Sequence, residues 1–114
     1  MKPITPGSCG LSTALSVIGG KWKATILWEL HSEPVRFGAL RRRLAGISEK
    51  VLFEQLREME ADGVIRREVF DDVAGRVEYS VTAAGASLND AVHALALWGT
   101  SHAARDEAVD HSTR

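Results

Sequence analysis

Apolar residues recur along this chain at two spacings, and each spacing predicts a different kind of element. In most of the chain the apolar positions lie three or four residues apart, as on one face of a helix. Between residues 64 and 82 they alternate with polar residues instead, which is typical of strands. The pattern predicts helices at 11–18, 21–31, 37–44, 48–62 and 83–105, an extended piece at 35–37, and strands at 64–70 and 76–82.

Turn-forming residues mark the ends of several of these elements. Gly19-Gly20 separates the first two helices, and Pro34 ends the second because proline disfavours helical backbone in the residue before it. Ser48 is a favourable N-cap, and Gly63 is placed to end the same helix. A glycine pair ahead of a lysine is also found in phosphate-binding loops. That loop requires a further glycine five residues earlier and a Ser or Thr after the lysine, and neither is present. We interpret the glycine pair as a hinge.

The order of elements predicts a mainly α-helical domain with a β-hairpin wing. Two helices joined by the short turn at 45–47 make a helix-turn-helix, and the two strands make the wing. Leu52, Leu56 and Met59 form the inward stripe of the second of these helices. The fold class is therefore a winged helix-turn-helix with a long C-terminal dimerisation helix.

The opposite face of the helix at 48–62 has the composition of a DNA-reading surface. The second helix of a helix-turn-helix enters the major groove, where Lys and Arg pair with guanine O6 and N7. Arginines outside this helix suit phosphates, and an arginine in the wing suits the narrow, negative minor groove. The candidate DNA-binding residues are Ser48, Glu49, Lys50, Phe53 and Arg57 on the helix, Arg36, Arg41 and Arg42 before it, and Arg76 in the wing.

Three questions about this surface stay open. Phe53 either packs against the neighbouring helix or touches a bound group such as a thymine methyl. Asp71 and Asp72 lie across the wing turn from Arg76 and would repel phosphates. Each arginine could equally belong to an ordinary solvated surface. The outward face of a winged helix that binds only proteins would instead be apolar, and such an interaction module without DNA readout is the alternative function.

The charge distribution supports an anionic partner although the net charge is only −1. Residues 36–67 contain eight Lys and Arg against five Asp and Glu, whereas the rest of the chain has six against ten. A basic middle with acidic flanks is a modest sign of an anionic partner such as double-stranded DNA. The 114 residues are enough for one domain, and we expect a flexible arm at 1–8, the folded domain at 9–105 and a flexible polar tail at 106–114. Without an apolar leader or an apolar run of 18 residues, a cytoplasmic protein is expected.

Several short motifs stand in order between residues 9 and 100. They are the cysteine at 9, IGGKW at 18–22, IL at 26–27, RFGALRR at 36–42, GIS at 46–48, LREMEADGVIRREVF at 56–70, RVEYSVTAAG at 76–85 and LALWG at 95–99. With these motifs the chain resembles the HxlR-type winged helix-turn-helix transcriptional regulators of the MarR-like superfamily. The resemblance implies a homodimer built by the terminal helices, which binds a pseudo-palindromic operator and regulates nearby genes, with repression expected.

The chain departs from that family at three positions. Family members usually carry a small polar residue, often threonine, where this chain has Phe53, so its base preference should differ. Many have prolines in the wing turn, where this chain has Ala74-Gly75, which suggests a more mobile wing. The residue after the N-terminal cysteine is usually proline, and here it is Gly10.

The long C-terminal helix also predicts a dimer from its own pattern. So small a domain cannot cover a helix from about Ala84 to Arg105, and its apolar stripe therefore needs a further surface. The stripe can pack on the first two helices of the same chain or on a second copy, and we expect both, with different residues. The predicted dimer interface comprises Leu11, Leu88, Val92, Leu95 and Trp98.

Cys9 is the one cysteine of the chain and a candidate redox sensor. A thiol near a helix N-terminus can have a lowered pKa, which makes it a better nucleophile. The resemblance implies that a small electrophile or oxidant is a candidate effector, whereas the plainer interpretation is a partly buried small residue.

Other chemistry has no candidate residues. The four histidines show no metal-ligand spacing, and no nucleophile is paired with a base. We therefore expect no catalytic residues, no cofactor and no metal.

Overall fold

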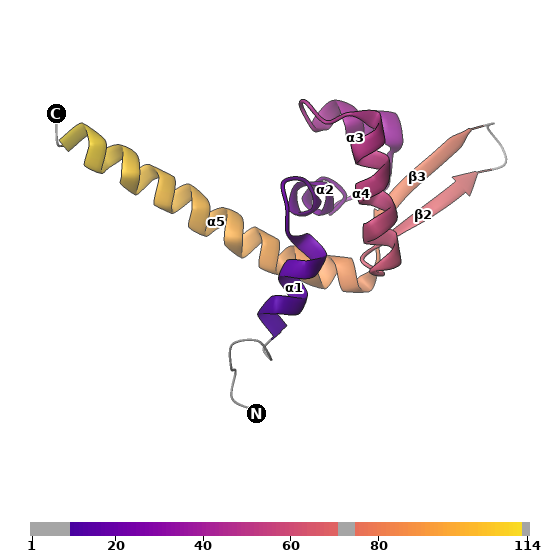
Figure 1. Ribbon diagram of the computed structural model, residues 1–114, viewed down its shortest axis with the longest axis horizontal. Helices are drawn as coiled ribbons and strands as arrows, with labels where there is room; N and C mark the ends of the chain where they lie inside the picture. The colour runs from indigo at the N-terminus through magenta and orange to yellow at the C-terminus, as the bar shows by residue number, and fades with distance from the viewer. Residues whose placement is uncertain (1–9, 71–74, 113–114) are drawn as a thin grey trace.

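The computed structural model describes residues 10–70 and 75–112, with side chains as far as Arg105. Figure 1 shows a body of short helices, a β-hairpin that projects from one side, and a long helix that projects from the other. The predicted winged helix-turn-helix is confirmed. The helices are α1 (Gly10–Ile18), α2 (Lys23–Glu29), α3 (Phe37–Arg43), α4 (Glu49–Ala61) and α5 (Ala83–Ser112), and the strands are β1 (Val35–Arg36), β2 (Ile65–Phe70) and β3 (Arg76–Val81).

Two helices differ in length from the prediction. α2 begins at Lys23 rather than near residue 21, because Gly20 has a φ of +92° and the chain bends before the helix starts. α5 continues to Ser112, past the end predicted near Arg105, because no glycine or proline follows Gly99. The backbone of the predicted polar tail is therefore helical as far as Ser112. The predicted arm at 1–8 lies outside the described residues.

The hinge between α1 and α2 is confirmed as a close approach of backbone to backbone. The Gly19 amide donates to the Leu15 carbonyl oxygen at 2.7 Å. A Cβ atom at position 19 would lie 2.3 Å from that oxygen, so no larger residue fits without a shift. The glycine pair is therefore a structural corner.

The ends of α4 follow the predicted capping chemistry. The Ser48 hydroxyl oxygen accepts a hydrogen bond from the Val51 amide at 3.1 Å. Gly63 follows the helix with a φ of +77°, a left-handed conformation that glycine adopts without strain. These two residues fix where the helix begins and ends.

The sheet has three strands, because the short extended piece expected at 35–37 joins the two strands of the wing. β3 lies in the middle and pairs antiparallel with β2 on one side and with β1 on the other. Tyr79 lies opposite both Val35 and Arg67, so these three residues form one row across the sheet. The sequence indicated an extended piece at 35–37 but not its partner, because a two-residue strand has no periodicity.

The core lies between α2, α3, α4 and the sheet. Leu52, Leu56 and Met59 are fully buried, as the inward stripe of α4 predicted, together with Ile26 and Leu27 of α2. α5 joins this core only at its start, through Val92 and the partly buried Leu88. Along its length, α5 has no segment apolar enough to span a membrane, and neither has any other described helix.

Two polar residues attach α5 to the rest of the body, and the sequence pattern did not reveal either. The buried Asn89 amide nitrogen donates to the Leu27 carbonyl at 2.9 Å. The Thr82 hydroxyl donates to the Gly63 carbonyl at 2.6 Å and accepts from the Gly85 amide at 3.1 Å. These bonds connect α2, the end of α4 and the wing to the first turns of α5.

The backbone of Gly85 lies so close to the backbone of Val64 that position 85 should tolerate no side chain. A Cβ atom there would lie 1.9 Å from the Val64 carbonyl oxygen. We expect Gly85→Ala to lower the free energy of unfolding by about 1–3 kcal/mol, measured by urea denaturation at one protein concentration.

Gly38→Ala is the matched control for this prediction. Gly38 lies inside α3, and a Cβ atom there meets only the tip of Arg42 at 3.6 Å. Alanine is the better helix former, so this variant should keep or raise the free energy of unfolding, by up to about 1 kcal/mol. An equal loss in both variants would contradict the close-approach interpretation.

Candidate nucleic-acid interface

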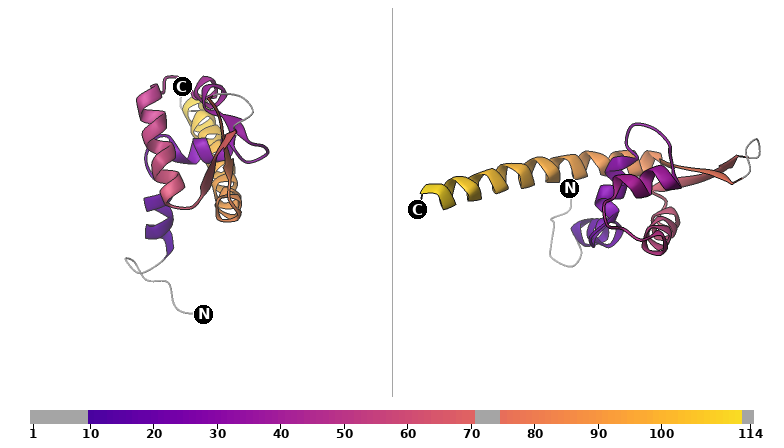
Figure 2. Two further views of the ribbon diagram at one scale, coloured as in Figure 1. Left: turned by 90° about the vertical axis from the view of Figure 1, so that its right-hand side faces the viewer. Right: turned by 90° about the horizontal axis from the view of Figure 1, so that it is seen from above.

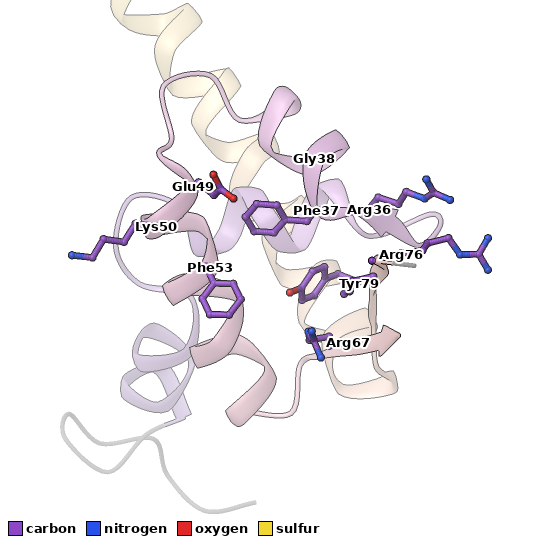
Figure 3. A pocket seen from close by; sticks show the side chains of 11 residues that line it. Arg36, Phe37, Gly38, Glu49, Lys50, Phe53, Arg67, Arg76 and Tyr79 are labelled. Atoms are coloured by element: carbon purple, nitrogen blue, oxygen red, sulfur yellow. The ribbon is translucent and has the colours of Figure 1, made fainter. Parts of the chain in front are cut away.

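The outward surface of α4 faces an open groove beside the wing. The groove has a volume of about 820 Å³ and runs between the first turns of α4 and the sheet. Figure 3 shows Phe53 of α4 and Tyr79 of β3 on its two sides, with Arg67 of β2 below them. We call this space the wing groove. Its charged and aromatic lining comprises Arg36, Phe37, Glu49, Lys50, Phe53, Arg67, Arg76 and Tyr79, so four cations and one carboxylate border it.

Arg67 is a site residue that the sequence reasoning missed. It lies opposite Tyr79 in the sheet and lines both the wing groove and a smaller hollow of about 200 Å³, which Arg57 also lines. The signal was present in the alternation of β2. Residues two apart in a strand share a face, so Arg67 lies on the same face as the buried Ile65. Arg66, its neighbour, points to the opposite face.

Most of the predicted phosphate and base contacts are unpaired cations at the surface. Arg36, Arg42, Lys50 and Arg57 are exposed and form no ion pair within the part of the chain that the structure describes. Lys23 is different, because its ammonium lies 2.9 Å from the Glu58 carboxylate. Arg36, Arg42, Lys50 and Arg57 are therefore available to an anionic partner.

Arg41 and Glu49 form a weak ion pair. The Arg41 guanidinium is 4.0 Å from the Glu49 carboxylate, and both side chains are about half exposed or more. A surface pair of this kind contributes little to stability and exchanges readily. Glu49 stands on the first turn of α4, beside the exposed cap residue Ser48, where its charge suits the helix dipole.

Arg76 is held within the wing. Its guanidinium lies 3.9 Å from the centre of the Phe70 ring and 3.7 Å from the Glu78 carboxylate. The side chain is mostly buried, which makes Arg76 less available to a minor groove than its sequence position suggested. The wing turn, with Asp71, Asp72 and Ala74, lies outside the described residues.

A family model described as HxlR-like helix-turn-helix matches residues 17–107. The chain is a member of this family. It is 40% identical over 101 residues to the uncharacterized HTH-type transcriptional regulator YkvN of Bacillus subtilis (strain 168). The matched region covers 89% of this chain and 86% of YkvN. The family and its relatives identify the chain as a DNA-binding transcriptional regulator.

Solved structures show the same fold. A transcriptional regulator of the MarR family from Enterococcus faecalis V583 is 42% identical, with a TM-score of 0.78 over 90% of this chain and 94% of that one. The redox regulator HypR in its reduced form is 39% identical, with a TM-score of 0.81 over 86% and 97%. Quinone-bound YodB from B. subtilis is 26% identical, with a TM-score of 0.71 over 86% and 99%.

In this HxlR-like regulator the predicted dimer residues divide into two groups. Val92 is buried and Leu88 partly buried, and both pack against the core of their own chain. Leu11, Leu95 and Trp98 are 64%, 57% and 66% exposed. The right-hand view in Figure 2 shows α5 extending well beyond the body of the domain. The helix therefore packs on its own chain at its start and leaves its middle uncovered.

The last sequence-based predictions concern the redox role of Cys9 and metal binding. Cys9 lies outside the described residues. Among the described residues, no three His, Cys, Asp or Glu side chains lie close enough together to hold a metal ion.

Proposed function

We propose that this HxlR-like regulator acts in the cytoplasm as a homodimer that represses genes by binding a pseudo-palindromic operator. α4 enters the major groove in each half-site, and the β2–β3 hairpin lies beside the adjacent minor groove. The DNA strand between the two grooves runs along the wing groove. The observation that carries this proposal is the set of unpaired cations around α4 and the wing groove.

Each cation has a role that its position supports. Lys50 and Arg57 on the outward side of α4 suit base edges, and the exposed Ser48 and Glu49 begin the same helix. Arg67 faces α4 across the wing groove and suits a phosphate between them. The remaining phosphate contacts are Arg36, Arg41 and Arg42, with Arg41 exchanging Glu49 for the DNA backbone. A surface for protein binding alone would present apolar residues here instead of these charges.

The dimer uses the apolar side chains that the single chain leaves uncovered. Leu11 and Leu15 of α1 and Leu95 and Trp98 of α5 are all more than half exposed. Large apolar side chains gathered on two terminal helices mark an interaction surface rather than ordinary scatter. A twofold dimer places two recognition helices about one DNA turn (~34 Å) apart, which matches a palindromic site.

We further propose that Cys9 makes operator binding responsive to electrophiles. The structural similarity to the redox regulator HypR and to quinone-bound YodB favours this role. The Cys9 thiolate adds to a ring carbon of a quinone, forming a carbon–sulfur bond. The displaced electron pair moves to the carbonyl oxygen, which takes up a proton, and no group leaves.

Replacing Arg67 by alanine should weaken operator binding and reduce its salt dependence. One phosphate contact contributes about 0.9 to the slope of log K against log salt, so the slope should fall by about that amount. Fluorescence anisotropy of a labelled operator between 50 and 200 mM salt measures both the affinity and its salt dependence. The control is Arg66→Ala, one residue away on the other face of β2, which should keep the wild-type slope. Equal slopes for the two variants would argue against a strand in the wing groove.

Introducing a charge at Trp98 should dissociate the dimer. Trp98→Glu places a carboxylate on the uncovered stripe of α5, where burial in an interface carries a large desolvation cost. Analytical ultracentrifugation should show monomers at concentrations where the wild type is dimeric. The control is Ala104→Glu. Ala104 is exposed and lies nine residues after Leu95, which is about two and a half helical turns and therefore the opposite side of α5 from Leu95. This variant should remain dimeric. A dimeric Trp98→Glu variant would place the interface elsewhere.

Treatment with a quinone should release the wild-type protein from its operator and leave Cys9→Ser bound. The serine hydroxyl is far less nucleophilic than a thiolate, so the adduct does not form. A gel shift with benzoquinone measures release, and mass spectrometry measures the adduct. Equal release of both proteins would rule out Cys9 as the sensor.

A further inference from the structure

Phe53 is an apolar side chain left open on the DNA-facing side of the domain. Its exposed fraction is 46%, although a phenylalanine ring gains more than most side chains from burial. Seven large apolar side chains are this exposed among the described residues, and five of them lie on α1 and α5. The proposed dimer uses four of those five, namely Leu11, Leu15, Leu95 and Trp98. Phe53 lies on α4, far along the chain from both helices, and needs a different partner.

The protein itself covers only about half of the Phe53 side chain. The ring lines the wing groove with Tyr79, whose own side chain is almost completely buried in the sheet. Among the described residues, Phe53 stacks on no other aromatic ring. Figure 3 shows the ring directed into the space between α4 and the wing rather than into the core. Of the two interpretations that the sequence left open, the structure shows part of each, since Phe53 packs with about half of its surface and leaves the other half exposed.

The charges around Phe53 determine what can approach it. Lys50 precedes it by three residues on α4, and Arg67 stands across the groove. Arg57 follows one turn later and lines the smaller hollow next to Phe53. Glu49 and Glu60 also line these hollows, but the cations outnumber them. This balance favours a partner that carries negative charge on its outside and presents an apolar group to the ring.

Thymine meets both requirements. Its C5-methyl group is the apolar feature that base pairs present in the major groove. The methyl lies on the side of the base edge nearest its own sugar–phosphate backbone. Phe53 occupies the matching position, on the flank of α4 that faces the groove proposed to hold that backbone, about 100° around the helix from the buried Leu52.

We propose that Phe53 is a specificity-determining residue that reads thymine through its C5-methyl group in each operator half-site. The inference rests on the proposed function, because it assigns a base preference to the same DNA interface. Phe53 contributes specificity through an apolar contact, whereas Arg67 binds the backbone regardless of sequence. Removal of one methyl contact should weaken binding by about four-fold per half-site, or about 15-fold for a symmetric dimer site.

Uracil provides a direct test, because it differs from thymine only by the missing methyl group. The probe is a duplex that the wild-type protein selects from a randomised pool. Its thymines are replaced by uracil one symmetric pair at a time, and the affinity for each duplex is measured by anisotropy at fixed salt. We expect one symmetric pair of positions at which the wild type loses about 15-fold.

Protein variants show whether Phe53 makes that contact. Phe53→Ala should bind the thymine and uracil duplexes equally, with about the affinity of the wild type for the uracil duplex. Phe53→Gln, which keeps a good helix former at this exposed position, is a second variant with the same expectation. Val69→Ala removes the other exposed apolar side chain outside α1 and α5 and should keep the wild-type preference. Circular dichroism verifies that each variant is folded.

The outcomes separate this inference from the proposed function. A wild-type protein that selects no duplex overturns the proposed function, and the inference with it. A wild-type protein that selects an operator but binds its thymine and uracil forms equally overturns the inference alone. A preference for thymine that persists in both Phe53 variants also overturns it, because another residue then reads the methyl group.

Discussion

The rotation of α4 about its own axis is the constraint on which the proposed DNA-binding surface depends. Leu52, Leu56 and Met59 are fully buried against the rest of the core, and any other rotation would expose them. With this stripe fixed, every other side chain of α4 has a set direction. Lys50 and Arg57 must point outward, and Phe53 must lie on the flank that borders the wing.

The sheet supplies the opposing wall by the same logic. Tyr79 is buried at the centre of a row that joins β1, β3 and β2, so the face of the sheet that meets α4 is fixed. Period-two alternation then brings Arg67 to that face and sends Arg66 to the other. An interface with charge on both walls and an aromatic ring between them therefore follows from two buried rows of side chains, without any contact made for DNA alone.

α5 connects α4 and the sheet to the surface that is proposed to hold a second copy. Its first turns are tied to the core through Val92, Asn89 and Thr82, so its direction relative to α4 is set within one chain. Beyond them, Leu95 and Trp98 extend past the body and are uncovered. A partner that packs on this part of the helix would hold a second α4 at a defined distance. The chain thus separates the residues that orient the helix from the residues proposed to join two copies.

The sequence by itself determined the elements and the class of the domain. The spacing of apolar residues, the Ser48 cap and the glycines at 19–20 and 63 act within a few residues of the chain. They can therefore be recognised from the sequence alone. It did not determine the pairing of β1, the burial of Arg76 over Phe70, or the division of the α5 stripe between core and surface. Alternation along β2 indicates which face of the strand Arg67 takes, but the approach of that face to Phe53 was decided only in three dimensions. Each of these depends on which residues distant in sequence meet across the core, and local periodicity holds no information about that.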